Sequence, residues 1–136
     1  MTLSRLMGIS ALLVVPCLAN ASNCGELEGS WQFVRGEYYT KQGKTVANAP
    51  LISSVKVIAS GYFNYVTQRQ GQFHYAAGGR CAIEDDKFVE YVDYGNIPSL
   101  LNKRLAFDYA LKDNQWHHRL YQDGVLVEYE VWRKLH

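Results

Sequence analysis

Eight short segments rich in Val, Ile, Tyr, Phe and Trp follow one another along most of this 136-residue sequence, with short polar breaks between them. Many of their apolar residues lie two apart, which is the alternation of a strand that buries one face. Strands joined by such short connections run antiparallel, because a parallel pair needs a crossover of about a dozen residues or more. The predicted strands are Trp31–Thr40, Ser53–Ala59, Tyr62–Thr67, Phe73–Ile83, Phe88–Tyr94, Arg104–Leu111, Trp116–Tyr121 and Val125–Arg133.

The breaks between these segments carry residues that favour tight turns. Asp123-Gly124 is the strongest hairpin signal, because both central residues of a type I′ turn need a positive φ. Two connections are longer, from Lys41 to Ile52 and from Asn96 to Lys103, and each contains a proline. The second is compatible with one short helical turn after its proline.

Eight such strands in series predict an all-β fold, an eight-stranded antiparallel up-and-down β-barrel. Closure removes the two exposed edges that an open sheet of this size would leave. A barrel of eight strands encloses a space that holds either side chains or one small ligand. A two-sheet sandwich of the same strands is the alternative, and the even spacing of the hairpins favours the barrel.

Residues 1–21 have the pattern of a secretory signal peptide. Arg5 supplies a positive start, residues 6–18 are apolar but too short to span a bilayer, and Ala19-Asn20-Ala21 is a small-x-small cleavage motif. We expect cleavage after Ala21 and a mature domain of residues 22–136 that is secreted, in the periplasm of a bacterium. No later apolar run is long enough to predict a transmembrane segment in the mature chain. An uncleaved N-terminal membrane anchor is the alternative.

Composition excludes several functional classes. With 48% hydrophobic and 20% charged residues, the chain is globular in composition and not disordered. Arg5 is the only charged residue of the signal segment, so its removal reduces the 14 Lys and Arg residues to 13, equal to the 13 Asp and Glu residues. A neutral chain lacks the basic face of a nucleic-acid binder and the polybasic segment of a membrane-surface protein.

Loss of the signal segment also removes Cys17 and leaves one pair, Cys24 and Cys81. An even pair in a secreted chain predicts a disulfide bond. The chain-entropy model assigns about 4 kcal/mol of stabilisation to a disulfide that closes the loop from Cys24 to Cys81. A metal-binding or redox-active pair is the alternative, but the spacing fits no zinc pattern and there is no Cys-x-x-Cys motif.

Several short motifs come in a particular order. Gly29-Ser30-Trp31 opens the first strand, and Glu130-Val131-Trp132-Arg133 ends the last. Between them stand an aromatic segment (62–65), a Gly78-Gly79 pair and Phe88-Val89-Glu90. This order resembles the lipocalin and fatty-acid-binding (calycin) superfamily, and more closely the small secreted lipocalin-like domains of bacteria. The resemblance spans residues 26–134 and departs at Cys81, where such domains often carry an aromatic residue.

The resemblance implies that Trp31 closes the floor of the barrel and that Arg133 packs over its indole. It also implies a monomeric protein that reversibly binds a small hydrophobic or amphipathic molecule inside the barrel. A tyrosine offers such a ligand a flat apolar body and one hydroxyl group. The aromatic residues that strand alternation places on the inward face are Phe63, Tyr65, Tyr75, Phe107, Tyr109 and Tyr129. In the alternative, these rings fill the barrel completely.

Two polar residues are added to this predicted ligand site. His118 shares a mostly apolar strand face with Trp116 and Leu120, so we expect it to point inward. Glu90 also lies on an apolar face, and a buried acid is costly unless it is paired. We therefore expect Glu90 to anchor a ligand or to pair with Arg133 or His118.

The sequence predicts no metal site, cofactor or catalytic triad. His117 and His118 are adjacent on a strand and face opposite ways, and no His-x-His or His-Glu-x-x-His motif occurs. A single inward histidine still has the chemistry to ligate a haem iron. Binding is the main hypothesis, with two rivals. One is an isomerase or cyclase that uses Glu90 and His118 as acid and base, and the other is a protein-interaction module with a solid barrel.

Overall fold

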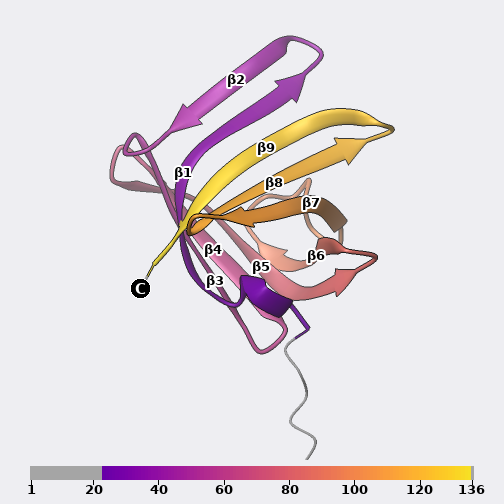
Figure 1. Cartoon of the computed structure of the whole chain (residues 1–136). Helices are drawn as coiled ribbons and strands as arrows, with labels where there is room; N and C mark the ends of the chain where they lie inside the picture. Colours follow the sequence, from indigo (N-terminus) through magenta and orange to yellow (C-terminus); the bar gives the residue numbers. More distant parts are fainter. Residues whose placement is uncertain (1–22, 136) are drawn as a thin grey trace, which may run out of the picture.

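The structure, a computed structural model, describes residues 23–135 (Figure 1). The predicted signal peptide, residues 1–21, lies outside the described residues. A 3₁₀ turn, η1 (Gly25–Leu27), precedes the strands. The strands are β1 (Gly29–Thr40), β2 (Gly43–Asn48), β3 (Ile52–Ala59), β4 (Tyr62–Arg69), β5 (Gln72–Glu84), β6 (Lys87–Gly95), β7 (Arg104–Lys112), β8 (Gln115–Gln122) and β9 (Val125–Lys134). None of the described residues forms a helix long and apolar enough to cross a bilayer.

Eight of these strands, β1 and β3–β9, close into an antiparallel barrel. Successive strands from β3 to β9 pair with their neighbours in the chain, and β1 pairs with β3 on one side and β9 on the other. The pairing of β1 with β9 runs from Trp31 opposite Lys134 to Tyr38 opposite Glu128. This closure confirms the predicted eight-stranded up-and-down barrel.

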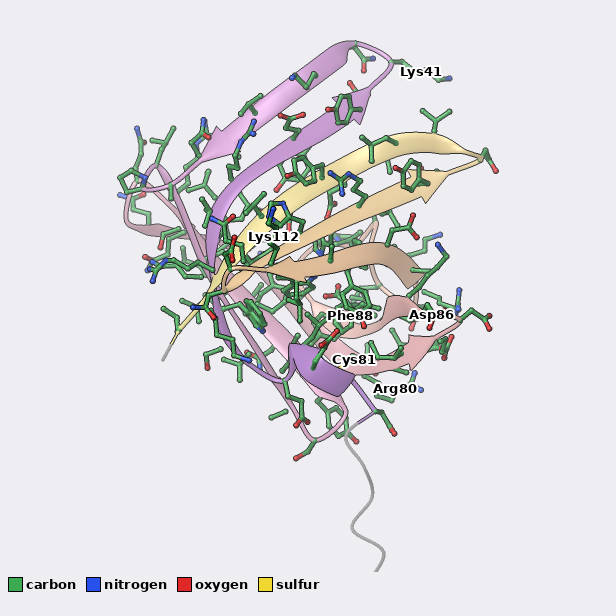
Figure 2. All side chains as sticks on the ribbon, in the orientation of Figure 1. Lys41, Arg80, Cys81, Asp86, Phe88 and Lys112 are labelled. Carbon is green, nitrogen blue, oxygen red and sulfur yellow. A yellow bond between two sulfur atoms is a disulfide. The ribbon has the colours of Figure 1, made fainter. Side chains whose placement is uncertain are left out.

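A ninth strand, β2, lies in the long connection between the first two predicted strands. β1 pairs with β3 through residues 29–32 and with β2 through residues 35–40, so its outer half forms a hairpin with β2 on one side and stays paired with β9 on the other. This hairpin extends away from the barrel, with Lys41 at its tip (Figures 1 and 2). Almost all of β2 is exposed, so it lacks the apolar alternation that identifies a strand in a sequence.

The second long connection, residues 96–103, is not helical. It contains two successive hydrogen-bonded turns, in which Leu100 N donates to Ile97 O and Lys103 N donates to Leu100 O, both at 3.0 Å. The short helical turn with which its sequence is compatible is therefore not formed. The turns instead place Ile97 and Leu100 at one end of the barrel.

Aromatic side chains fill the other end of the barrel. Trp31 is 2% exposed, and its Nε1 donates a 2.8 Å hydrogen bond to the carbonyl of Leu27 in η1. The Trp116 ring meets the Trp31 ring edge-on with centroids 5.4 Å apart, and Phe88 packs against Trp116 at 5.3 Å. Trp31 thus closes the barrel floor, as the resemblance implies.

The predicted disulfide bond joins Cys24 to Cys81, whose Cα atoms lie 5.6 Å apart. Both cysteines are buried, and Cys81 lies beside η1 near Phe88 (Figure 2). A backbone hydrogen bond of 2.7 Å from Ile83 N to Asn23 O adds to this link. The segment before β1 is therefore fastened to β5 beneath the floor.

The predicted partner of Trp31 is wrong by one residue. Lys134, not Arg133, covers the indole, with its Nζ 4.8 Å from the ring centroid and donating to the carbonyl of Glu28 at 2.7 Å. Arg133 is exposed and donates to Gln32 Oε1 at 2.6 Å.

A β-bulge near the start of β9 decides which of its side chains face inward. Leu120 pairs with Glu128 and Tyr121 pairs with Leu126, so Val127 is an extra residue in the ladder. An extra residue reverses the alternation of every side chain after it. Consequently Glu128, Glu130, Trp132 and Lys134 share the inward side of β9.

Candidate ligand cavity

A cavity of about 270 Å³ opens at the end of the barrel opposite Trp31. Apolar side chains lie around its mouth, among them Ile52, Ile97 and Leu100, and aromatic and charged side chains from seven strands line it further in. The aromatic residues therefore fill the floor but leave this end of the barrel hollow.

Four predicted site residues line this cavity: Tyr65, Tyr75, Glu90 and Phe107. Phe63 is fully buried in the core, in contact with Tyr65. His118 is 1% exposed and lies behind the cavity wall, with its ring stacked on Phe107 at 4.4 Å. The structure thus places four of the predicted residues in the cavity wall and two, Phe63 and His118, in the packed core.

Two predicted site residues lie elsewhere. Tyr109 packs at the edge of the core without lining the cavity. Tyr129 was predicted to face inward, and this is wrong. Its ring stacks on His117, its hydroxyl hydrogen-bonds with His117 Nδ1 at 2.8 Å, and Arg119 lies over it at 4.4 Å. The bulge at Val127 again explains the reversal.

A buried ion pair, Lys56 with Glu90, lies deep in the cavity. Lys56 Nζ is 2.7 Å from Glu90 Oε1, and each side chain is only 3% accessible. Glu90 is therefore paired as expected, but with neither Arg133 nor His118. The Lys56 ammonium is also surrounded by aromatic rings, those of Tyr65, Trp132, Trp116 and Phe63, with centroids 5.1 to 5.8 Å away.

The sequence does not reveal Lys56, because on β3 the apolar residues next to it suggest that they, and not Lys56, face the interior. Val55 and Val57 are 40% and 36% exposed on the outer surface, whereas Ser54 and Lys56 are buried. The signal that identifies this lysine is the acid at Glu90, which needs a cation across the barrel.

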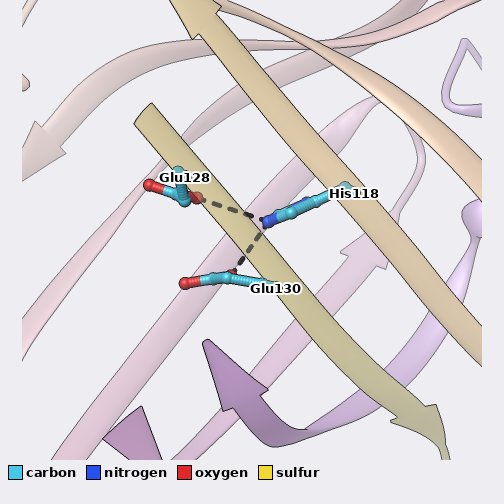
Figure 3. Close-up of side chains that lie close together, drawn as sticks. All are labelled: His118, Glu128 and Glu130. Carbon is cyan, nitrogen blue, oxygen red and sulfur yellow. Dashed lines mark hydrogen bonds and ion pairs between the residues drawn. The ribbon is translucent and has the colours of Figure 1, made fainter. Parts of the chain in front are cut away.

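A second polar cluster centres on Glu130. Its Oε1 accepts a hydrogen bond from the Tyr38 hydroxyl at 2.5 Å. Its Oε2 accepts from His118 Nε2 at 3.0 Å and from Trp132 Nε1 at 2.8 Å. The same His118 nitrogen lies 3.3 Å from Glu128 Oε1, so one imidazole contacts two carboxylates (Figure 3). Glu128 and Glu130 were not predicted, because the unshifted alternation places them outside.

The pKa values of this cluster follow from burial and mutual contact. Burial lowers the pKa of His118, but its hydrogen bonds to Glu128 and Glu130 outweigh burial and leave the pKa above 6.5. Burial raises the pKa of Glu130, but the hydrogen bond and charge of His118, together with Lys56, make the net shift downward. For Glu128, burial and the neighbouring Glu130 charge raise the pKa.

The two carboxylates also differ in their access to the cavity. The Glu128 side chain lines the cavity and keeps 26% of its surface accessible. The Glu130 side chain keeps 12% and already has a donor on each oxygen. Glu128 is therefore the carboxylate that a bound molecule can reach.

The cluster is also compatible in spacing with a metal ion, because one ligand atom each from His118, Glu128 and Glu130 lies within 4.8 Å of the others. Two observations favour a hydrogen-bonded network instead. Both Glu130 oxygens are occupied by donors. A metal-bound histidine also normally donates its other nitrogen to a second partner, and His118 Nδ1 has none within residues 23–135.

Fold and cavity together define the class of protein. It is a closed eight-stranded antiparallel barrel with a cavity at one end, an architecture consistent with a calycin-like fold. No protein-family model matches the sequence, and neither does any curated protein or solved structure. The disulfide is compatible with a secreted protein.

Proposed function

We propose that this chain is a lipocalin-like binding protein of an oxidising compartment, such as the bacterial periplasm, and that its barrel reversibly holds a small amphipathic molecule. The observation that carries the proposal is the open-ended cavity, which combines an apolar mouth with charged and aromatic walls. Pockets that bind small molecules share this combination, because apolar surface supplies affinity and a few polar groups supply orientation.

The size of the cavity favours a compact ligand. A volume of about 270 Å³ is just below the range of roughly 300–1,000 Å³ for small-molecule pockets, while a cavity of about 150 Å³ holds one benzene. A ligand of one or two rings fits this space. A long-chain fatty acid would extend through the mouth.

The hydrogen bonds within the site favour holding a ligand over proton transfer. Glu90 is bound to Lys56 and lies apart from His118's hydrogen-bonding partners, so the acid–base pair envisaged for an isomerase is not formed. The rival protein-interaction module would bind its partner through its loops. Such a module has no need of the cavity at this end of the barrel. Reversible binding makes use of both the cavity and its polar wall.

The proposal is tested by titration with N-phenyl-1-naphthylamine. This neutral dye becomes more fluorescent in apolar surroundings. We expect saturable binding near one equivalent per chain. Leu100→Trp should weaken this binding at least tenfold, because the larger ring fills the mouth. Leu101→Trp is the matched control, because the neighbouring Leu101 is exposed on the same loop and does not line the cavity.

Thermal midpoints of both variants should stay close to that of the wild type, which shows that the loop substitution leaves the barrel folded. Absence of dye binding at tens of micromolar would rule out the carrier function. Equal binding by both variants would place the dye outside the cavity.

A further inference from the structure

We infer that the ligand carries a cationic amine, whose ammonium group pairs with the carboxylate of Glu128 inside the cavity. This inference rests on the proposed function and specifies the ligand's chemistry. It comes from the balance of charges in the barrel and from the greater accessibility of the Glu128 carboxylate than of Glu90 or Glu130.

The charges inside the barrel do not cancel. Lys56 and Glu90 neutralise each other at 2.7 Å. In the part of the chain that the structure describes, His118 is the remaining cationic partner beside the cavity, and it faces two carboxylates, those of Glu128 and Glu130. Even with His118 protonated, one negative charge has no partner of its own. A desolvated charge of this kind requires either a proton or a cationic ligand.

Glu128 is the acid that carries this excess charge. Glu130 holds the closer contact with His118 and two further donors, Tyr38 and Trp132. Within the described residues, Glu128 pairs only with His118, at the longer distance of 3.3 Å. An ammonium group is a strong donor to such a carboxylate and adds the missing positive charge.

The surrounding walls suit the rest of such a ligand. Phe33, Tyr65, Tyr75 and Trp132 line the cavity together with Glu128. Aromatic faces attract a cation and also provide flat apolar surface for a ring or a short chain. An anionic ligand would lack a free cation to pair with, since the two cations found near the cavity among residues 23–135, Lys56 and His118, already contact carboxylates.

The test compares three probes of nearly equal size and different charge: 2-phenylethylamine, 2-phenylethanol and phenylacetate. Each is titrated by calorimetry at neutral pH into the full protein treated with a chelator. The wild type should bind the amine at least tenfold more tightly than the alcohol, and phenylacetate most weakly.

The matching variant is Glu128→Gln, which keeps the size of the side chain and its acceptor oxygen but removes the charge. It should lose the tenfold preference for the amine while binding the alcohol within about twofold of wild type. Glu26→Gln is the control, because Glu26 is exposed at the η1 end of the barrel and should leave the preference unchanged.

Equal affinity for amine and alcohol in the wild type would overturn the inference and leave the proposed function standing. Tightest binding of phenylacetate, or an amine preference that survives Glu128→Gln, would also overturn it. Micromolar binding of Zn²⁺ alone with no binding of the amine would identify the cluster as a metal site instead. Binding of none of the probes, and no binding of the neutral dye, would remove the proposed function itself.

Discussion

Lys56 and Glu90 show how costly charges are kept inside this barrel. Desolvating an ion costs several kcal/mol, and each of these side chains is only 3% accessible. Their contact with each other and the aromatic rings around Lys56 offset that cost. Each residue is therefore required mainly because the other is present.

A double-mutant cycle tests this mutual dependence. Lys56→Met should lower the free energy of unfolding by about 3–5 kcal/mol, because it leaves the Glu90 carboxylate buried and unpaired. Adding Glu90→Leu should recover most of that loss, since both charges are then replaced by apolar groups of similar size. Urea unfolding of the two single variants and the double variant measures the coupling. Additive losses would show that the two residues do not depend on each other.

His118 gives the protein a pH-dependent contribution to stability. Burial lowers its pKa, but hydrogen bonds to Glu128 and Glu130 raise the folded-state pKa above the ordinary value of 6.5. A group with a raised folded-state pKa stabilises the fold fully below its unfolded pKa, and this contribution is lost as pH rises through the folded value.

The free energy of unfolding should therefore decrease as the pH is raised above about 6.5, and His118→Gln should flatten this decrease. Urea unfolding at several pH values between about 6 and 9 measures both slopes. The control is His74→Gln, an exposed histidine on β5, which should keep the wild-type slope. An unchanged slope in His118→Gln would contradict the assignment.

At the scale of single elements, the local sequence is a good guide to where a strand lies. It is a poorer guide to which face of that strand is buried. Val127 is one extra residue in β9, yet it turns Glu128 and Glu130 inward and Tyr129 and Arg133 outward. On β3, burial likewise favours the polar positions over the valines. Both inversions occur in strands that supply charged residues to the cavity, Lys56 from β3 and Glu128 and Glu130 from β9.

At the scale of the whole molecule, closure and one covalent link act together. The pairing of β1 with β9 closes the barrel. The Cys24–Cys81 disulfide then holds η1, and with it Leu27, against the floor beneath Trp31. A chain this size has a modest core, so the link is a substantial part of its stability.

Reduction of this disulfide should lower the free energy of unfolding by about 2–4 kcal/mol and the thermal midpoint by several degrees. The Cys24→Ser/Cys81→Ser variant should melt at a similar temperature and should not respond to reductant. Thermal melts with and without reductant measure both effects. The unreduced protein should also titrate no free thiol; two reactive thiols in that sample would contradict the pairing.

The sequence by itself determined the class of fold. Apolar alternation and turn residues depend on neighbours within a few positions, so they locate eight strands and require antiparallel pairing. The cysteine pair follows from an equally simple signal, and the floor residue Trp31 from the resemblance of the motif order to lipocalin-like domains. Four cavity residues, Tyr65, Tyr75, Glu90 and Phe107, also follow from alternation alone.

Only the tertiary structure decided which charges meet inside the barrel. The bulge at Val127 is visible only in the ladder between β8 and β9, because the extra residue is defined by its partner strand. Lys56 faces Glu90 across a sequence separation of 34 residues, and Tyr38 reaches Glu130 across 92. No local pattern encodes such contacts. They arise because closure of the barrel places strands that are distant in the sequence around the same interior. A charge buried there is stable only when it is paired with an opposite charge or a hydrogen-bonding group.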